Sequence, residues 1–295
     1  MTKPTTTSEK TVLRAPLGIL ATATATHGTG RDDDIPLPRL PGFVESAFSP
    51  LAYEVSRQCL TERPDGGTSR SSEAESGGGS RTAVALASLL GDTTTADLAS
   101  RRMVSGQVHN PLLFMQATPN SVLGHTSREF GITGQMFSTS FFDDPLTELL
   151  AMADLLLEDP ELERVLVLGV ELGGGERPAA MHRELTDGGA LPAPDLPPSA
   201  GLAAAVLLGR AGAGAPVTVR SAQTPGADAG AVDRPGGIQG LFDLAAAHRQ
   251  LLRNGGIRLL PGPATAFVLT ADTSDTADTS GTADTADETE THAHQ

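Results

Sequence analysis

The chain has 295 residues, a formal net charge of −15 and an aromatic content of 3%. This length is ample for one large hydrophobic core and short for two full domains with long loops. The acidic balance argues against nucleic-acid binding, which requires a basic surface to displace counterions. The sequence contains no apolar run of about 18 residues and no signal-peptide pattern, so we expect a cytoplasmic protein without a membrane span.

The first third of the chain alternates apolar segments with polar connections. We expect a flexible N-terminus over residues 1–11 and a domain over residues 12–270. Within this domain, residues 12–26 predict a strand and residues 43–60 a helix. Residues 63–81 are mainly Gly, Ser, Glu and Asp and indicate a flexible loop. A second strand is expected to begin directly after this loop, over residues 82–90.

Cys59 is the only cysteine, which excludes a disulfide within one chain. It follows Leu51 and Val55 at fourfold spacing, and this spacing places the three side chains on one helical face. A cysteine on an apolar face is usually a small buried hydrophobic residue, so we do not expect it to be a nucleophile.

The middle of the chain predicts a helix that starts at Pro145, and strand 164–169. The last of these, like residues 202–208 further on, is a continuous apolar run without alternation. Such runs are typical of strands that are buried on both faces in an α/β layered fold.

The second half begins with a connecting segment over residues 173–199 that is rich in Pro, Gly and Ala. We expect residues 202–208 and 217–222 to pair as a hairpin, and a helix near Ile238 and a strand over residues 264–270 to close the domain. Residues 271–295 contain seven acidic residues and no Lys or Arg, so the rest of the chain carries −8. This composition predicts a disordered acidic tail, because it cannot offset the entropy of ordering. Two histidines in the tail do not make a metal site, and we expect no metal and no cofactor.

The segment from His109 to Ser140, with the helix and strand that follow it, resembles the central segment of a β-ketoacyl synthase. This family has the thiolase fold, in which helices pack on a mainly buried mixed sheet. The resemblance is good over about residues 80–172 and holds only in outline at the two ends. It implies a helix over residues 112–124 and a strand over residues 135–140. It implies a fold that is shortened in its second half, because active ketosynthases are considerably longer.

Active ketosynthases carry a cysteine at the elbow between this strand and the next helix. A helix N-terminus stabilises the thiolate that accepts an acyl group. This chain instead has Phe142, Asp143 and Asp144 before Pro145. Asp144 before a proline is typical of an N-cap, so we interpret the elbow as degenerate and assign no catalytic residue.

The other catalytic landmarks of the family are missing as well. Its catalytic histidines and lysine lie in the second half, whereas the only lysines here are Lys3 and Lys10. The string from His27 to Gly30 lies at the wrong end of the chain and is interpreted as a turn. Gly237 stands where the family has a histidine before a helix.

The resemblance therefore points to a chain-length-factor-like subunit. Such subunits pair with an active ketosynthase in type II polyketide synthesis, including systems that form polyenes, and shape the acyl tunnel. The partners implied are that ketosynthase and, through it, an acyl carrier protein. The implied tunnel or pocket residues are Met115, Thr118, Met136, Phe137, Phe141 and Phe142. The implied dimer-interface residues are Phe114, Gln116, Asn120, Gln135, Ser138, Thr139 and Ser140.

Three alternatives stay open. The aromatic residues of the tunnel set are equally compatible with simple core filling, since Phe prefers interiors. The chain could be a carrier-protein-dependent acyltransferase, thioesterase or dehydratase that uses Ser138 or Ser140 with His109 or His125, although no Gly-x-Ser-x-Gly elbow supports this. It could also be a scaffold that stabilises a ketosynthase without touching the acyl chain.

Overall fold

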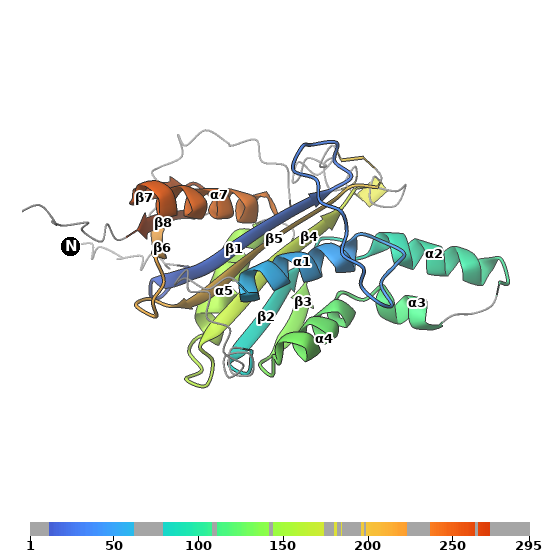
Figure 1. The fold of residues 1–295 in the computed structure, drawn as a ribbon, viewed down its shortest axis with the longest axis horizontal. Coiled ribbons are helices and arrows are strands. Elements are labelled where there is room, and N and C mark those ends of the chain that lie inside the picture. The colour runs from blue at the N-terminus through green and yellow to red at the C-terminus, as the bar shows by residue number, and fades with distance from the viewer. Residues whose placement is uncertain are drawn as a thin grey trace, which may run out of the picture.

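The computed structural model describes residues 12–61, 79–107, 111–141, 144–173, 199–222, 237–262 and 265–271, and single residues at 180, 181, 184, 196 and 197. Within this part of the chain the strands form one eight-stranded mixed sheet with the order β3-β2-β4-β5-β1-β6-β8-β7 (Figure 1). The strands are β1 (Leu17–His27), β2 (Thr82–Ala87), β3 (Met136–Thr139), β4 (Arg164–Leu172), β5 (Gly201–Arg210), β6 (Val217–Ala222), β7 (Gly256–Leu260) and β8 (Ala266–Ala271).

Helices cover both faces of this sheet. One hydrophobic cluster joins the sheet to α1 and α4, and a second joins its other face to α5 and α7. The domain is therefore an α/β/α sandwich, which confirms the predicted layered α/β class. The helices are α1 (Phe48–Thr61), α2 (Thr93–Val104), α3 (Pro111–Gln116), α4 (Pro119–Phe130), α5 (Pro145–Leu156) and α7 (Gln239–Asn254).

Parallel and antiparallel pairing divide the sheet into two regions. β2 pairs in parallel with β3 and with β4, so the carboxyl ends of these three strands lie at the same end of the sheet. All other pairs are antiparallel. The expected hairpin between the strands now labelled β5 and β6 is wrong, because β1 lies between them and pairs with both.

The central strands are buried on both faces, as their continuous apolar runs predict. In β2 the side chains of Ala83 and Ala85 face the α5–α7 layer, and those of Val84 and Leu86 face the α1–α4 layer. On α1 the fourfold spacing is confirmed, since Leu51, Val55 and Cys59 are all fully buried.

The predicted helix over residues 112–124 is two helices in the structure. Pro119 has no N–H to donate and occupies the first turn of α4, with Thr118 as the extended N-cap residue. The chain therefore breaks between α3 and α4, and the two helices lie near β3 at one end of the sheet (Figure 1). This break turns the exposed side chains of α3 away from the core.

Two glycines allow α7 to approach the rest of the domain closely. A Cβ atom on Gly169 of β4 would lie 2.3 Å from Cγ2 of Ile238, and one on Gly240 would lie 2.9 Å from Cβ of Leu146 on α5. Neither position has room for a side chain. The start of α7 is thereby held against the carboxyl half of β4 and beside α5.

Some elements differ from the expected ones. Helix α2 and strand β7 were not predicted, because α2 has a weakly apolar face and β7 carries four exposed residues. β8 continues through Ala271, one residue past the expected domain boundary. The predicted N-terminal segment, most of the loop over residues 63–81 and the tail from residue 272 lie outside the described residues. Of the helices described, none has the length and apolarity needed to span a bilayer.

Candidate functional site

The segment that we expect to be a degenerate elbow joins β3 to α5. Asp144 is the N-cap residue of α5, and its carboxylate accepts hydrogen bonds from the backbone N–H of Thr147 at 3.3 Å and from the Thr147 hydroxyl at 2.6 Å. The first of these bonds satisfies one of the backbone N–H groups that have no partner within the first turn of a helix. The position before Pro145 predicts this role, and the structure confirms it. Phe142 and Asp143 lie outside the described residues.

The single thiol of the chain is remote from this elbow. Cys59 lies on α1 in the α1–α4 layer, on the opposite face of the sheet from α5. A fully buried cysteine of this kind packs as a hydrophobic residue. It cannot replace a nucleophile at the elbow.

A partly buried carboxyl group occupies the neighbouring strand end. Glu171 lies near the end of β4 and accepts a hydrogen bond of 2.8 Å from the backbone N–H of Leu89, which follows β2. Burial raises the pKa of Glu171 to about 7. Gly237, where the family places a histidine, lies beside this carboxyl group, since a Cβ atom there would be 3.6 Å from Cγ of Glu171.

Sequence reasoning missed Glu171, although a signal was present. An acidic residue inside an otherwise apolar strand is rare and marks a position that needs a partner. The carboxyl group links the end of β4 to the loop that leads to α2. It is therefore positioned to hold that loop, and its raised pKa places its protonation near neutral pH.

The serine alternative has no support in the described geometry. The hydroxyl of Ser140 donates to the backbone carbonyl of Ser88 at 2.9 Å. His125 lies on α4, with its ring edge-on to Phe43 and Tyr53 at centroid distances of 6.1 and 5.7 Å. The structure thus places the His125 ring in an aromatic cluster, and His109 lies outside the described residues.

The residues of the implied tunnel do not line one enclosed space. Met136 packs into the α1–α4 layer, whereas Phe137 and Phe141 pack against the α5–α7 layer. Met115 and Thr118 are exposed at the end of α3 and at the start of α4. The residues of the implied tunnel are therefore divided between the two faces of the sheet at β3.

β3 is an edge strand. Among the described residues it pairs only with β2. The carbonyl group of Gln135 accepts a hydrogen bond from the N–H of Val84 in β2, and that of Thr139 from the N–H of Ser88, directly after β2. Successive peptide groups of a strand point in opposite directions. The N–H and C=O groups of Met136 and Ser138 therefore point away from β2, toward the open edge.

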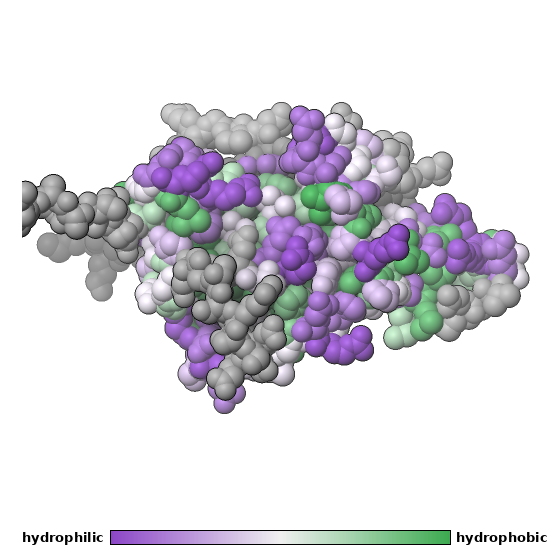
Figure 2. All heavy atoms as spheres, viewed as in Figure 1, coloured by the Kyte–Doolittle hydropathy of each residue, from purple (hydrophilic) through white to green (hydrophobic). Residues whose placement is uncertain are grey.

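An arm formed by α2 and α3 extends beyond one end of the sheet (Figure 1). Apolar side chains lie exposed on this arm among the polar residues of α2 (Figure 2). Asn120 follows on α4 and is exposed as well. We call this surface the α2–α3 arm. Its exposed large apolar residues are Met103, Val104, Leu112, Phe114 and Met115.

Comparisons with known proteins identify the fold. No protein-family model matches the sequence, and neither does any curated protein. Among solved structures, the complex of a ketosynthase with its chain length factor from Xenorhabdus doucetiae contains a chain that matches at a TM-score of 0.52 and 14% identity. That match covers 87% of this chain and all of the solved chain.

Two further solved structures show weaker matches. The ishigamide ketosynthase/chain length factor matches at a TM-score of 0.43 and 14% identity, over 72% of this chain and 56% of that one. A β-ketoacyl synthase from Burkholderia phymatum matches at 0.39 and 18%, over 68% of this chain and 59% of that one. This chain thus spans less than two thirds of either protein. The first of the three solved structures, at a TM-score above one half, shows that this chain has a ketosynthase-like, thiolase-type fold.

Proposed function

We propose that this chain is a non-catalytic, ketosynthase-like subunit that pairs with an active β-ketoacyl synthase in polyketide or fatty-acid-like synthesis. The observation that carries this proposal is the open edge of β3 beside an elbow that has no nucleophile. In the solved complex from Xenorhabdus doucetiae a ketosynthase is bound to a chain length factor. This chain would take the place of the second component.

The open edge supports the pairing because its outward backbone groups have no strand partner in the part of the chain that the structure describes. The outward N–H and C=O groups of Met136 and Ser138 match those of another edge strand, and continuation of the sheet would satisfy them. β3 is only half-buried along its length. A partner strand would bury the surface of β3 that is still exposed.

The α2–α3 arm supports the same interface with apolar surface. Met115 is 62% exposed and Val104 is 88% exposed, while Phe114 is 38% exposed. Several exposed apolar side chains gathered on one part of a folded domain are typical of a protein interface. The arm is joined to the edge strand through α4, which contacts both α3 and β3, so one partner could cover both.

The chemistry of the complex would then belong to the partner. At the elbow of this chain Asp144 is committed to capping α5, and the cysteine is buried on the other face of the sheet. The partner would supply the cysteine and histidines and receive the acyl carrier protein. This chain would contribute the residues on both sides of β3 to the wall of the acyl cavity.

Cavity shaping predicts an effect of bulk at an exposed position. Met115→Trp adds volume on the α2–α3 arm without disturbing the core, because this side chain is largely exposed. We expect complexes with this variant to release shorter products. The measurement is the product length distribution of the complex by mass spectrometry.

The matched control is Leu252→Trp on α7, which is 51% exposed and lies far from β3. It should leave the product distribution unchanged. A second candidate function, a scaffold that does not touch the acyl chain, is favoured if Met115→Trp assembles normally and product lengths do not change.

A further inference from the structure

The sheet has a second edge at β7, at the end opposite β3 in the strand order. Among the described residues β7 pairs only with β8, so one side of its backbone has no strand partner there. Four of its five residues are exposed. An exposed edge strand is a template for pairing with other chains, and native proteins protect such edges. A chain that presents β3 to a partner therefore needs a means to keep β7 unpaired.

The two faces of β7 differ in their chemistry. Leu260 packs in the cluster with α5 and α7, so Arg258, two residues earlier, points to the same face of the sheet. Ile257 and Leu259 point to the opposite face and are 70% and 53% exposed. The hydrophobic cluster under α1 and α4 includes no residue of β6, β7 or β8. These two apolar side chains therefore lie on a part of the sheet that this cluster does not cover.

Basic residues follow the α7 side of this edge. Arg253 lies in the last turn of α7, and β7 begins three residues later. Arg253 and Arg258 are exposed, and neither forms an ion pair among the described residues. Arg249, one turn earlier, donates to the Thr24 hydroxyl at 3.1 Å. Residues 244–271 contain these three arginines and no acidic side chain. We call the surface formed by Arg253, Ile257, Arg258 and Leu259 the α7–β7 surface.

The segment that follows β8 has the opposite charge. Residues 272–295 contain seven acidic side chains and no Lys or Arg. This segment begins directly after Ala271, which pairs with Gly256 at the start of β7. An extended chain spans about 3.3 Å per residue, so about ten residues are enough to pass along the whole of β7. The carboxylates of this segment therefore begin within short reach of Arg253 and Arg258.

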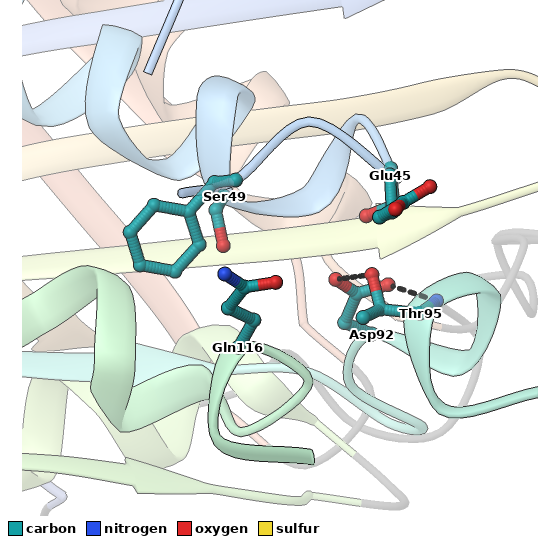
Figure 3. A pocket seen from close by; sticks show the side chains of 7 residues that line it. Glu45, Ser49, Asp92, Thr95 and Gln116 are labelled. Carbon is teal, nitrogen blue, oxygen red and sulfur yellow. Dashed lines mark hydrogen bonds between the residues drawn. The ribbon is translucent and has the colours of Figure 1, made fainter. Parts of the chain in front are cut away.

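The α2–α3 arm is less suited to an acidic segment. Two carboxylates, those of Asp92 and Glu45, lie where α2 begins (Figure 3). Asp92 caps α2 and accepts hydrogen bonds from the N–H of Thr95 at 3.0 Å and from its hydroxyl at 2.8 Å. Glu45 lies 3.7 Å from the guanidinium group of Arg102. These negative charges weaken the attraction of the arm for further carboxylates, and residues 244–271 carry none of this kind.

We propose that residues 272–295 bind the α7–β7 surface of the same chain and protect the β7 edge. Their carboxylates pair with Arg253 and Arg258, and the chain passes over the exposed edge strand. A ketosynthase then finds only β3 open, so each chain binds one partner in one orientation. This role rests on the proposed function, whereas the contact itself lies within one chain.

The test of the contact is cross-linking with a carbodiimide, which joins an amine to a carboxylate that touches it. The only lysines of the chain are Lys3 and Lys10, so Arg258→Lys places an amine on the α7–β7 surface without changing its charge. The purified complex with the ketosynthase is cross-linked and digested, and the joined peptides are identified by mass spectrometry. We expect links from position 258 to residues 272–295, about fivefold more at about 50 mM than at about 500 mM salt, because salt screens this attraction.

The matched control is Arg31→Lys. Arg31 is exposed and forms no ion pair among the described residues, like Arg258. It follows the end of β1, whereas Ala271 pairs with Val217, which itself pairs with Ile19 near the start of β1. Arg31 therefore lies at the other end of the strands, and this variant should give no links to residues 272–295.

The test of the protective role is deletion of residues 272–295. We expect complexes with the deleted chain to associate with one another at about 50 mM salt, with a mass by light scattering that rises with concentration. Leu259→Glu in the deleted chain should reverse this association, because it places a charge on the exposed edge. This single charge is small beside the seven that the deletion removes, so a reversal identifies the β7 edge and not the net charge as the cause.

Three results would overturn the inference. The first is a lack of links from position 258, or equal links from positions 258 and 31. The second is links between isotope-labelled and unlabelled chains in a mixture of complexes, which would show that the segment binds a second copy. The third is an unchanged mass of the complex after the deletion. In all three cases the proposed function stands. Absence of any complex overturns the proposed function, and cross-linking of the chain alone then still reports whether the contact exists.

Discussion

The partly buried carboxyl group of Glu171 and the buried imidazole of His248 have pKa values shifted in opposite directions. Burial raises the pKa of Glu171 from 4.5 to about 7. Burial, with a smaller contribution from Arg249, lowers the pKa of His248 from 6.5 to about 4. His248 lies on α7, and its Nδ1 is 3.0 Å from the Thr22 hydroxyl. Each shift makes the free energy of unfolding depend on pH.

The two dependences have opposite signs. Between pH 4.5 and 7 folded Glu171 holds a proton that the unfolded chain releases, so its contribution to stability falls as the pH rises. Between pH 4 and 6.5 the unfolded chain protonates His248 and the folded chain does not, so that contribution rises with pH. Between pH 4.5 and 6.5 the contributions of Glu171 and His248 to the free energy of unfolding therefore largely cancel.

Single substitutions should remove this cancellation. We expect Glu171→Gln to make the free energy of unfolding rise by up to about 3 kcal/mol between about pH 4.5 and 6.5, and His248→Gln to make it fall by a similar amount. Glutamine retains an acceptor for the Leu89 N–H and cannot titrate. Urea unfolding at several pH values provides the measurement. If the free energy of unfolding depends on pH in the same way for both variants and the wild type, neither residue has a shifted pKa.

Substitution of Asp144 tests whether this residue has a structural or a catalytic role. Asp144→Ala removes both hydrogen bonds to Thr147 and should lower the free energy of unfolding by about 0.5–2 kcal/mol, whereas Asp144→Asn should preserve most of it. Turnover by the complex should not change in either variant. A rate loss of a hundredfold or more at an unchanged melting temperature would identify Asp144 as a catalytic residue.

At the scale of elements, the apolar pattern of the sequence predicted most strands and the main helices because burial on one or both faces leaves a clear periodicity. It failed where this signal is weak. α2 has little apolar periodicity, and β7 is an edge strand with Ile257 and Leu259 exposed. The break at Pro119 was available in the sequence, since proline at the first turn of a helix marks a new start.

The edge strand permits a test at this scale. Ser138→Pro removes an N–H group that points away from β2, so the β2–β3 hydrogen bonds remain possible while pairing with a partner strand loses a donor. We expect this variant to lose association with the ketosynthase at nearly unchanged melting temperature. Size-exclusion chromatography of the co-expressed chains gives the result.

Ser138→Ala is the matched control, because it retains the backbone N–H and should assemble like the wild type. Normal assembly of folded Ser138→Pro would mean that the open edge of β3 is not part of the interface. In that case the α2–α3 arm would have to bind the partner without β3.

At the scale of the whole molecule, the sequence indicated the fold class but not the strand order. The insertion of β1 between β5 and β6 joins residues that are about two hundred positions apart, such as Leu17 and Val219. Periodicity reports only local environment and carries no information on such pairing. The candidate site shows the same limit, since Glu171, Leu89 and Gly237 meet only through the sheet.

The acidic tail can be tested by truncation. Deletion of residues 272–295 removes seven acidic residues and leaves β8 complete through Ala271. We expect no change in melting temperature or in assembly at physiological salt. If the tail binds a basic partner surface, the loss of affinity should appear mainly at low salt, where charges are least screened. Deletion of residues 266–295, which removes β8, should prevent folding and serves as the control.

The central claim is that this chain exists to pair with an active ketosynthase. The most direct measurement is the mass, by light scattering, of the species purified after co-expression with the active β-ketoacyl synthases of its source organism. The account predicts one stable complex that contains both chains in equal amounts, and an unstable or aggregating protein when the chain is expressed alone. A well-behaved monomer with no affinity for any of these ketosynthases would contradict it.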